Sequence, residues 1–367
     1  MRHTELEPEQ KIFKTLKGDL RAGGFRKSIR AEFRELKEFM LNEQGKKRLS
    51  EMGWWRRWFF TAWWLVKSLF FKLTPVRRIV FTVGIFFLVI ARSITVSSDQ
   101  VQFRGDTQGI GVVCVLFVLL LELKDKLIAR EELEAGRAVQ QALMPETTPQ
   151  IAGWNIWLFS RSANEVGGDL VDCVEVGEGK LGIVLGDVAG KGLRAALLMA
   201  KLQATVRAVA PDYSDLSELA GKLNGIFYRD SLKNMFASAL YIEVTPNTDQ
   251  IRLVNAGHLP PLIVHSKGYE VHLKGGPALG LMQVATYQEQ QLSVKPGEII
   301  CLYSDGVTEA QNASGVFFDV HRVGDFLEQS VDLPVHRIGS MIVAEIDRFI
   351  GEARCRDDVS LALIKRV

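Results

Sequence analysis

The sequence has few cysteines and histidines and little net charge. Its 367 residues include four cysteines, six histidines and 11 prolines, and the formal net charge is +2. The cysteines are isolated and form no CxxC pair, which argues against a zinc site or a disulfide framework: Cys114, Cys173, Cys301 and Cys355. With 47% hydrophobic and 24% charged residues the composition is that of a folded protein. At this length we expect two or three parts.

Two common catalytic motifs are also missing. The glycine-rich run at 186–192 lacks the Walker A spacing, and no Ser or Thr follows Lys191, so nucleotide binding of that kind is excluded. Ser304 has no nucleophile-elbow pattern around it, which excludes serine-hydrolase chemistry.

Positive charge is concentrated at the start of the chain, where residues 1–78 carry roughly ten excess positive charges. An amphipathic helix is expected at 28–49, and Arg and Lys alternate with Trp and Phe from 54 to 71. This mixture is typical of a helix at the lipid headgroups, so we predict a basic, helical cytoplasmic or interfacial segment at 1–75 that contacts lipid and no nucleic acid. The alternative is a helix packed on a protein partner.

Two apolar segments follow, at 79–96 and 109–123, with a polar loop at 97–108 between them. Lys and Arg flank the outer ends, so the positive-inside rule predicts a transmembrane helical hairpin over 76–123. Both termini and the catalytic domain would then be cytoplasmic, in a multi-pass protein of the inner membrane. The second segment is short for a span, which needs about twenty residues. The alternative is a pair of buried helices in a soluble domain.

Residues 119–144 form a charged, helix-favouring connector. Leu121, Ile128, Ala135 and Ala142 recur every seven residues, a weak seam through which two copies of the helix would form a homodimer. A solvated single helix explains the pattern equally well. Pro145 ends the helix and begins the catalytic domain, 145–367.

The catalytic domain alternates short apolar runs with helical ones. We expect strands at 154–159, 181–185, 237–244, 251–254, 261–264 and 299–303, and helices at 193–209, 216–230 and 335–350. Tight turns link adjacent strands, so the sheets should be largely antiparallel in an α+β domain of layered sheets and helices.

Four acidic positions lie where a strand meets a turn, mostly beside glycine: Asp169, Asp187, Asp305 and the pair Asp357-Asp358. A strand fixes the carboxylate next to it, and glycine lets the backbone approach a ligand closely. Carboxylates gathered in one place repel unless a cation compensates them, and hard oxygen ligands select Mg²⁺ or Mn²⁺. A lone Asp-Gly turn is weak evidence, but four such positions predict a metal site.

Five motifs together resemble the SpoIIE/RsbU-type serine phosphatases of the metal-dependent phosphatase 2C superfamily. They are Val166-Gly167-Gly168-Asp169, Gly186-Asp187-Val188-Ala189-Gly190-Lys191-Gly192, Asn255-Ala256-Gly257-His258, Ser304-Asp305-Gly306-Val307-Thr308-Glu309-Ala310 and Asp357-Asp358-Val359-Ser360. The resemblance covers about residues 130–367. It implies a four-layer α-β-β-α sandwich, two Mn²⁺ or Mg²⁺ ions, and hydrolysis of phosphoserine or phosphothreonine on a protein.

The resemblance also implies roles for individual residues. Asp187 would bridge both metals, Asp169 and the Val188 carbonyl would complete one site, and Asp305 with Asp357 the other; Asp358 is the alternative ligand. Lys191 and Arg194 are candidate phosphate contacts at a helix N-terminus or merely solvated side chains, and His258 is a structural turn residue or a general acid. Leu170, Val171 and Asp319 depart from the family pattern without touching a metal position.

Three hypotheses follow: an active phosphatase controlled by its N-terminal parts, a catalytically silent scaffold that binds a phosphoprotein, and another two-metal enzyme such as a nucleotide cyclase. The complete set of acidic positions argues against a scaffold, and no purine pocket is evident for a cyclase. The resemblance suggests a phosphorylated anti-sigma-factor antagonist as substrate.

Overall fold

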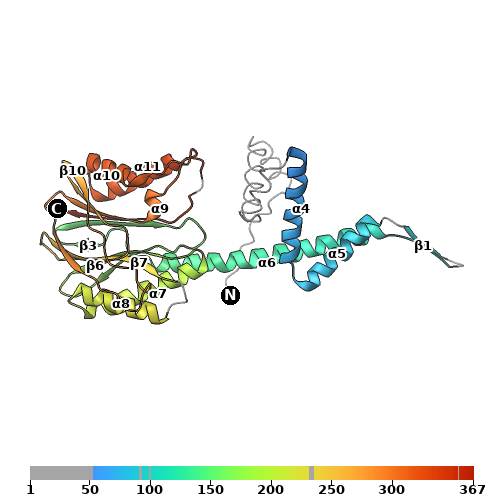
Figure 1. Cartoon of the computed structure of the whole chain (residues 1–367), viewed down its shortest axis with the longest axis horizontal. Helices are drawn as coiled ribbons and strands as arrows, with labels where there is room; N and C mark the ends of the chain where they lie inside the picture. The colour runs from blue at the N-terminus through green and yellow to red at the C-terminus, as the bar shows by residue number, and fades with distance from the viewer. Residues whose placement is uncertain (1–52, 91–92, 99–100, 231–234, 354) are drawn as a thin grey trace, which may run out of the picture. The chain divides into compact units, whose positions relative to one another are not determined.

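The computed structural model describes residues 53–90, 93–98, 101–230, 235–353 and 355–367 (Figure 1). The predicted helix at 28–49 lies outside them. The chain divides into two compact units between Lys126 and Leu127.

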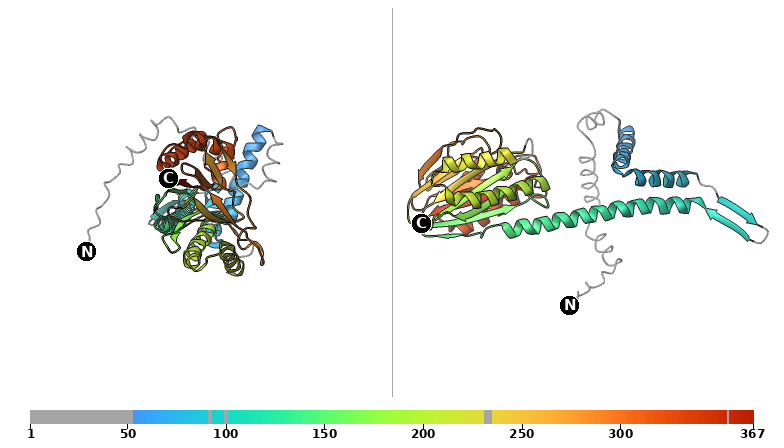
Figure 2. Two further views of the ribbon diagram at one scale, coloured as in Figure 1. Left: turned by 90° about the vertical axis from the view of Figure 1, so that its left-hand side faces the viewer. Right: turned by 90° about the horizontal axis from the view of Figure 1, so that it is seen from below.

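The first unit is mainly helical. It contains α4 (Trp54–Lys72), α5 (Pro75–Val89), the strands β1 (Ser93–Ser98) and β2 (Val101–Asp106), and the start of α6 (Thr107–Leu143). The prediction of a polar loop at 97–108 is wrong, because most of these residues belong to an antiparallel hairpin in which Ser98 pairs with Val101. The β-branched run Ile94-Thr95-Val96 favours this extended conformation. The second apolar segment and the connector form one unbroken helix, α6 (Figure 2, right).

Helices α5 and α6 meet at glycines. A Cβ on Gly84 would lie 3.1 Å from the Cβ of Cys114, and one on Gly111 would lie 2.7 Å from the Gly84 carbonyl oxygen, so only glycine permits this approach. Arg77 adds ion pairs to Glu122 at 2.8 Å and to Asp125 at 2.6 Å. The close backbone packing and the ion pairs together fix α5 against α6.

The predicted transmembrane hairpin is not supported. Helix α5 ends after 15 residues, whereas a span needs about twenty. Among the residues that the structure describes, no helix is both long enough and apolar enough to cross a bilayer. Many apolar side chains of α5 and α6 are nevertheless exposed, including Val76, Val89 and Val113.

The second unit contains two antiparallel sheets. One has the order β10-β9-β12-β13-β4-β3 and the other β11-β8-β7-β6-β5. The bounds are β3 (Gln150–Ile151), β4 (Trp154–Arg161), β5 (Leu170–Glu175), β6 (Leu181–Val188), β7 (Ala237–Val244), β8 (Gln250–Ala256), β9 (Leu262–His265), β10 (Gly268–Val271), β11 (Glu289–Ser293), β12 (Ile299–Tyr303) and β13 (Val359–Arg366).

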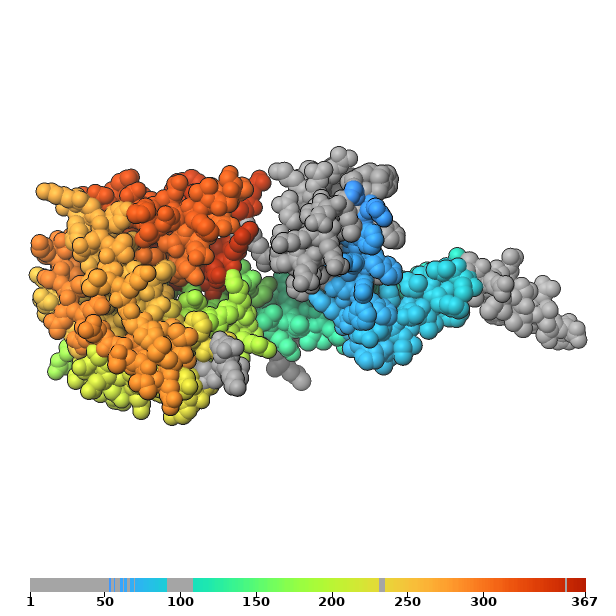
Figure 3. Space-filling view, viewed as in Figure 1, coloured from blue at the N-terminus to red at the C-terminus, as the bar shows by residue number. Residues whose placement is uncertain are grey.

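Helices cover the outer face of each sheet, and the two inner faces pack together. Helices α10 (Asp319–Ser330) and α11 (Val335–Ile350) lie on the first sheet, and α7 (Leu193–Val209) and α8 (Leu216–Asp230) on the second. In Figure 3 these pairs form the orange-red and yellow-green surfaces of the unit. The short helices η1 (Ala210–Asp212) and α9 (Asp305–Thr308) complete it.

Strand β12 shows how the sequence builds these layers. Cys301 and Tyr303 face the helices, whereas Ile300 and Leu302 face the other sheet, as the two-residue period of a strand requires. All four are buried. The predicted α+β class, the antiparallel sheets and the α-β-β-α sandwich are confirmed.

Candidate active site

The predicted acidic residues lie at the ends of strands β5, β6, β12 and β13. Asp187 is in β6, paired with Ser238 of β7, and Asp169 directly precedes β5. Asp305 follows β12, and Asp357 precedes β13, the antiparallel neighbour of β12. These positions bring both loops to one end of the sheet.

Gly306 lets the loops of Asp305 and Asp357 touch. A Cβ at Gly306 would collide with the backbone carbonyl of Asp358 and lie 3.1 Å from the carbonyl carbon of Asp357. Packing therefore requires a glycine at position 306, directly after Asp305.

Asp357 and Asp358 have different surroundings. The Asp358 carboxylate is buried and accepts hydrogen bonds from the backbone N–H groups of Ala163 (2.8 Å), Gly168 (2.7 Å) and Asp169 (3.3 Å). The Asp357 carboxylate is 45% exposed and accepts a hydrogen bond from the Lys191 ammonium at 2.7 Å. Asp358 thus holds the loop before β5, and Asp357 is the accessible carboxylate.

Burial and mutual repulsion make ionisation of the carboxylates costly. Burial, together with the charges of Asp305, Asp357 and Asp358, raises the pKa of Asp187 to about 7. Burial and the Asp357 charge also raise the pKa of Asp305. Asp169 is buried, with a pKa well above its usual range, and its Oδ2 atom has no hydrogen-bond partner among the residues that the structure describes.

The donors fit a hard divalent cation. A Cβ on Gly168 would lie 3.3 Å from the Val188 carbonyl oxygen and 3.6 Å from Asp187 Oδ1, so this glycine leaves room beside both oxygens. Within the described ranges, no three His, Cys, Asp or Glu side chains converge closely enough to hold a metal ion as they stand. Mutual repulsion favours such a spread arrangement, and a divalent charge would offset it. The oxygen-only chemistry and the unpartnered Asp169 Oδ2 suit Mg²⁺ or Mn²⁺.

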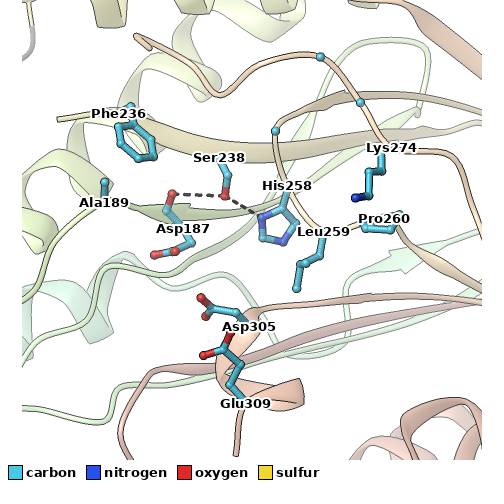
Figure 4. Close-up of a pocket in the computed structure, with 13 residues that line it drawn as sticks. Asp187, Ala189, Phe236, Ser238, His258, Leu259, Pro260, Lys274, Asp305 and Glu309 are labelled. Carbon is cyan, nitrogen blue, oxygen red and sulfur yellow. Dashed lines mark hydrogen bonds between the residues drawn. The ribbon is translucent and has the colours of Figure 1, made fainter. Parts of the chain in front are cut away.

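Two cavities meet at Asp187. The larger, of about 610 Å³, also has Asp305, Glu309, Phe236 and Lys274 in its wall (Figure 4). The smaller, of about 10 Å³, has room for no more than one water molecule and is lined by Lys191, Asp357, Asp358 and Gly168. Arg194 is exposed in the first turn of α7 and lines neither cavity, so the structure does not bring this predicted contact to the site.

His258 lies in the wall of the larger cavity with its ring held in place. Its Nδ1 is 2.9 Å from Ser238 Oγ, which lies 3.4 Å from the Asp187 carbonyl oxygen (Figure 4). If Ser238 donates to that carbonyl, it accepts from Nδ1–H; if it donates to Nδ1, the ring proton lies on Nε2. Burial lowers the pKa of His258 to about 4, so the ring is neutral at pH 7 in either tautomer. A buried, neutral imidazole with such a low pKa favours the structural interpretation over the general acid.

Gln140 was missed by the sequence analysis. Its buried side-chain amide donates to the Gly167 carbonyl at 3.0 Å and accepts from the Gly167 N–H at 3.1 Å. The end of α6 is thus attached to the loop that carries Asp169. One polar residue in a charged helix gives no sequence signal of such a contact.

Comparisons with known proteins agree with this fold. A sequence model of stage II sporulation protein E (SpoIIE) matches residues 177–367. Protein IcfG of Synechocystis is 29% identical over 273 residues, covering 67% of this chain and 43% of IcfG. Phosphoserine phosphatase RsbU of Bacillus subtilis is 29% identical over 240 residues, covering 65% of this chain and 70% of RsbU. The chain therefore spans less than half the length of IcfG.

The fold is also found in solved structures. The PP2C domain of SiaA from Pseudomonas aeruginosa matches with a TM-score of 0.57 at 20% identity, covering 66% of this chain and 98% of that domain. At that identity the likeness concerns the fold alone. The family match covers more than half of the sequence, and it includes three of the four strand-end acidic positions, namely Asp187, Asp305 and the pair Asp357-Asp358. The chain therefore belongs to the SpoIIE family.

Proposed function

We propose that the chain is a metal-dependent protein serine/threonine phosphatase that hydrolyses phosphoserine or phosphothreonine on a signalling protein. The observation that carries the proposal is Asp187, a carboxylate on the wall of both cavities whose pKa is raised by burial and by three neighbouring carboxylates. Perturbed carboxylates gathered in a cleft are typical of a catalytic centre.

We propose that two Mn²⁺ or Mg²⁺ ions are held by Asp187 between them, by Asp169 and the Val188 carbonyl on one side, and by Asp305 and Asp357 on the other. When bound, the ions would lower the pKa of a water molecule and stabilise charge on the phosphoryl oxygens. The accessibility of Asp357 supports it over Asp358, whose carboxylate is engaged by three backbone N–H groups.

The chain's own residues would orient the phosphoryl group. Lys191 lies next to the Asp357 carboxylate, and its exposed ammonium is accessible to an anion that approaches the carboxylates from solvent. Gly190 and Gly192 on either side of it have positive φ angles, 115° and 71°, which give the loop a conformation that other residues rarely adopt. The neutral His258 holds the wall through Ser238 and transfers no proton.

The substrate is proposed from the family. Because RsbU is a phosphoserine phosphatase and the chain belongs to the same family, a phosphoprotein of partner-switching type, such as an anti-sigma-factor antagonist, is the proposed substrate.

Hydrolysis of p-nitrophenyl phosphate with Mn²⁺ tests the activity. The wild type should turn over only with metal, and Asp187→Asn should lower the rate by on the order of a thousandfold, because it removes a carboxylate shared by both metal sites. Asp212→Asn, an exposed aspartate away from both cavities, is the matched control. A wild type inactive with Mn²⁺ and with Mg²⁺ would instead favour the scaffold that binds a phosphoprotein without cleaving it.

Two interactions of the N-terminal parts belong to the proposal as well. The exposed apolar side chains of α5 and α6 support contact with a lipid bilayer, and the exposed Ile128, Ala135 and Ala142 support a homodimer through α6. Location at the inner membrane stays a prediction. Co-sedimentation with anionic vesicles and the solution mass of the full chain test these interactions; a monomer that leaves vesicles unbound would contradict both.

A further inference from the structure

The larger cavity extends well beyond the carboxylates. Its volume of about 610 Å³ far exceeds that of one phosphoryl group. Phe236, Leu259 and Pro260 provide apolar walls, and Gly257, Gly275 and Gly276 present backbone. Such a mixture suits an extended peptide segment, because apolar walls contact side chains and exposed backbone groups offer hydrogen bonds.

One cation lies among the described residues of this wall. Lys274 is exposed, and its ammonium is directed into the cavity; in the view of Figure 4, His258 lies between it and Asp187. No residue that the structure describes forms an ion pair with Lys274, although Asp305 and Glu309 line the same cavity. The positive charge is therefore available to a ligand at a point separate from the carboxylates.

The backbone next to Lys274 is fixed. The Gly276 N–H donates to the Asn255 carbonyl at 2.9 Å, and Gly276 bridges Ala256 at the end of β8. A Cβ on Gly275 would collide with the Asn255 carbonyl oxygen, so this segment lies directly against the strand. Lys274 is thus presented by a rigid element, as a recognition residue requires.

We propose that Lys274 is a specificity-determining residue that binds an acidic side chain of the substrate protein near the phosphorylated residue. This inference rests on the proposed phosphatase function. The phosphoryl group would lie at the carboxylates, and the neighbouring segment would follow the apolar wall towards Lys274. Charge complementarity then selects substrates in which Asp or Glu accompanies the phosphoserine.

The test compares kcat/KM for a set of phosphoserine peptides with Mn²⁺. One peptide has neutral neighbours, and in the others a single Glu is moved one residue at a time along both sides of the phosphoserine. For the wild type we expect one Glu position to raise kcat/KM by about three- to fivefold over the neutral peptide, as a partly exposed ion pair would. Most of the increase should come from a lower KM.

Lys274→Ala should remove this preference, and Lys274→Glu should transfer it to the peptide with Lys at the same position. Lys267→Glu, which makes the same charge change in the turn between β9 and β10, should retain the wild-type preference. An acidic preference that persists in Lys274→Glu, or a wild type that hydrolyses all the peptides equally, would overturn the inference alone. A wild type that hydrolyses neither the peptides nor p-nitrophenyl phosphate would refute the phosphatase function, and the inference with it.

Discussion

The attachment of α6 to the Asp169 loop gives the sharpest prediction. Gln140→Leu keeps a side chain of similar size but removes both hydrogen bonds to Gly167. The N–H and C=O of Gly167 then lose their partners in a buried place, which costs about 1–3 kcal/mol for each group. Partial relaxation of the loop leaves a net cost of about 2–4 kcal/mol.

This cost falls on the loop conformation that presents Asp169. Since 1.4 kcal/mol is a factor of ten, we expect the Mn²⁺ concentration for half-maximal hydrolysis to rise by about tenfold or more. The rate at saturating Mn²⁺ should change less, because excess metal restores the loop. A titration of p-nitrophenyl phosphate hydrolysis with Mn²⁺ measures both quantities.

Gln150→Leu is the matched control, because the Gln150 side chain is exposed and, among the described residues, donates a hydrogen bond only to the nearby Thr148 carbonyl. If Gln140→Leu and Gln150→Leu had the same metal dependence and the same unfolding temperature, the attachment would have no energetic weight and the reasoning would be refuted.

Three further predictions concern other contacts. Asp358→Asn should lower the free energy of unfolding more than Asp357→Asn, whereas Asp357→Asn should weaken Mn²⁺ activation more; urea unfolding and metal titration would contradict this if the order were reversed. Arg207→Met should cost about 3–5 kcal/mol in urea unfolding, because it leaves the carboxylate of Asp172, 1% exposed, without its two 2.7 Å hydrogen bonds; a cost below about 1 kcal/mol would show that the pair is solvated. The pKa of His258 is lowered to about 4 from 6.5, so its contribution is present above pH 6.5 and is lost as the pH falls towards 4. His258→Gln should flatten the fall in urea midpoint over that range, and an equally steep fall in the variant would contradict the assignment.

Local patterns predicted much of the catalytic fold. The predicted bounds of α7, α8 and α11 match the structure, because each has an apolar face with helical spacing. Strand β5 was missed, since Asp172 makes it resemble a polar turn. Its charge is compensated by Arg207, on a different element and 35 positions away, so only the folded chain reveals that this acid belongs in a strand.

In the candidate site, too, local patterns were predictable from the sequence and contacts between distant residues were not. Asp169, Asp187 and Asp305 were identified from strand-end patterns that each occupy a few residues. The preference for Asp357 over Asp358 came from the resemblance alone, and neither the hydrogen bonds of Asp358 nor the contact of Gln140 was predicted, because both depend on backbone groups brought from distant positions.

The position of Asp187 between two cavities has a thermodynamic consequence. A ligand in the larger cavity and a cation beside the smaller one act on the same carboxylate, so their binding equilibria are coupled. Linkage requires this coupling to be reciprocal: whatever factor a bound peptide adds to cation affinity, the cation adds to peptide affinity. If the coupling is positive, as opposite charges on a phosphorylated ligand and a cation would make it, the proposed substrate would help to load the proposed metal centre, and the dependence of activity on metal concentration would change with the amount of substrate present.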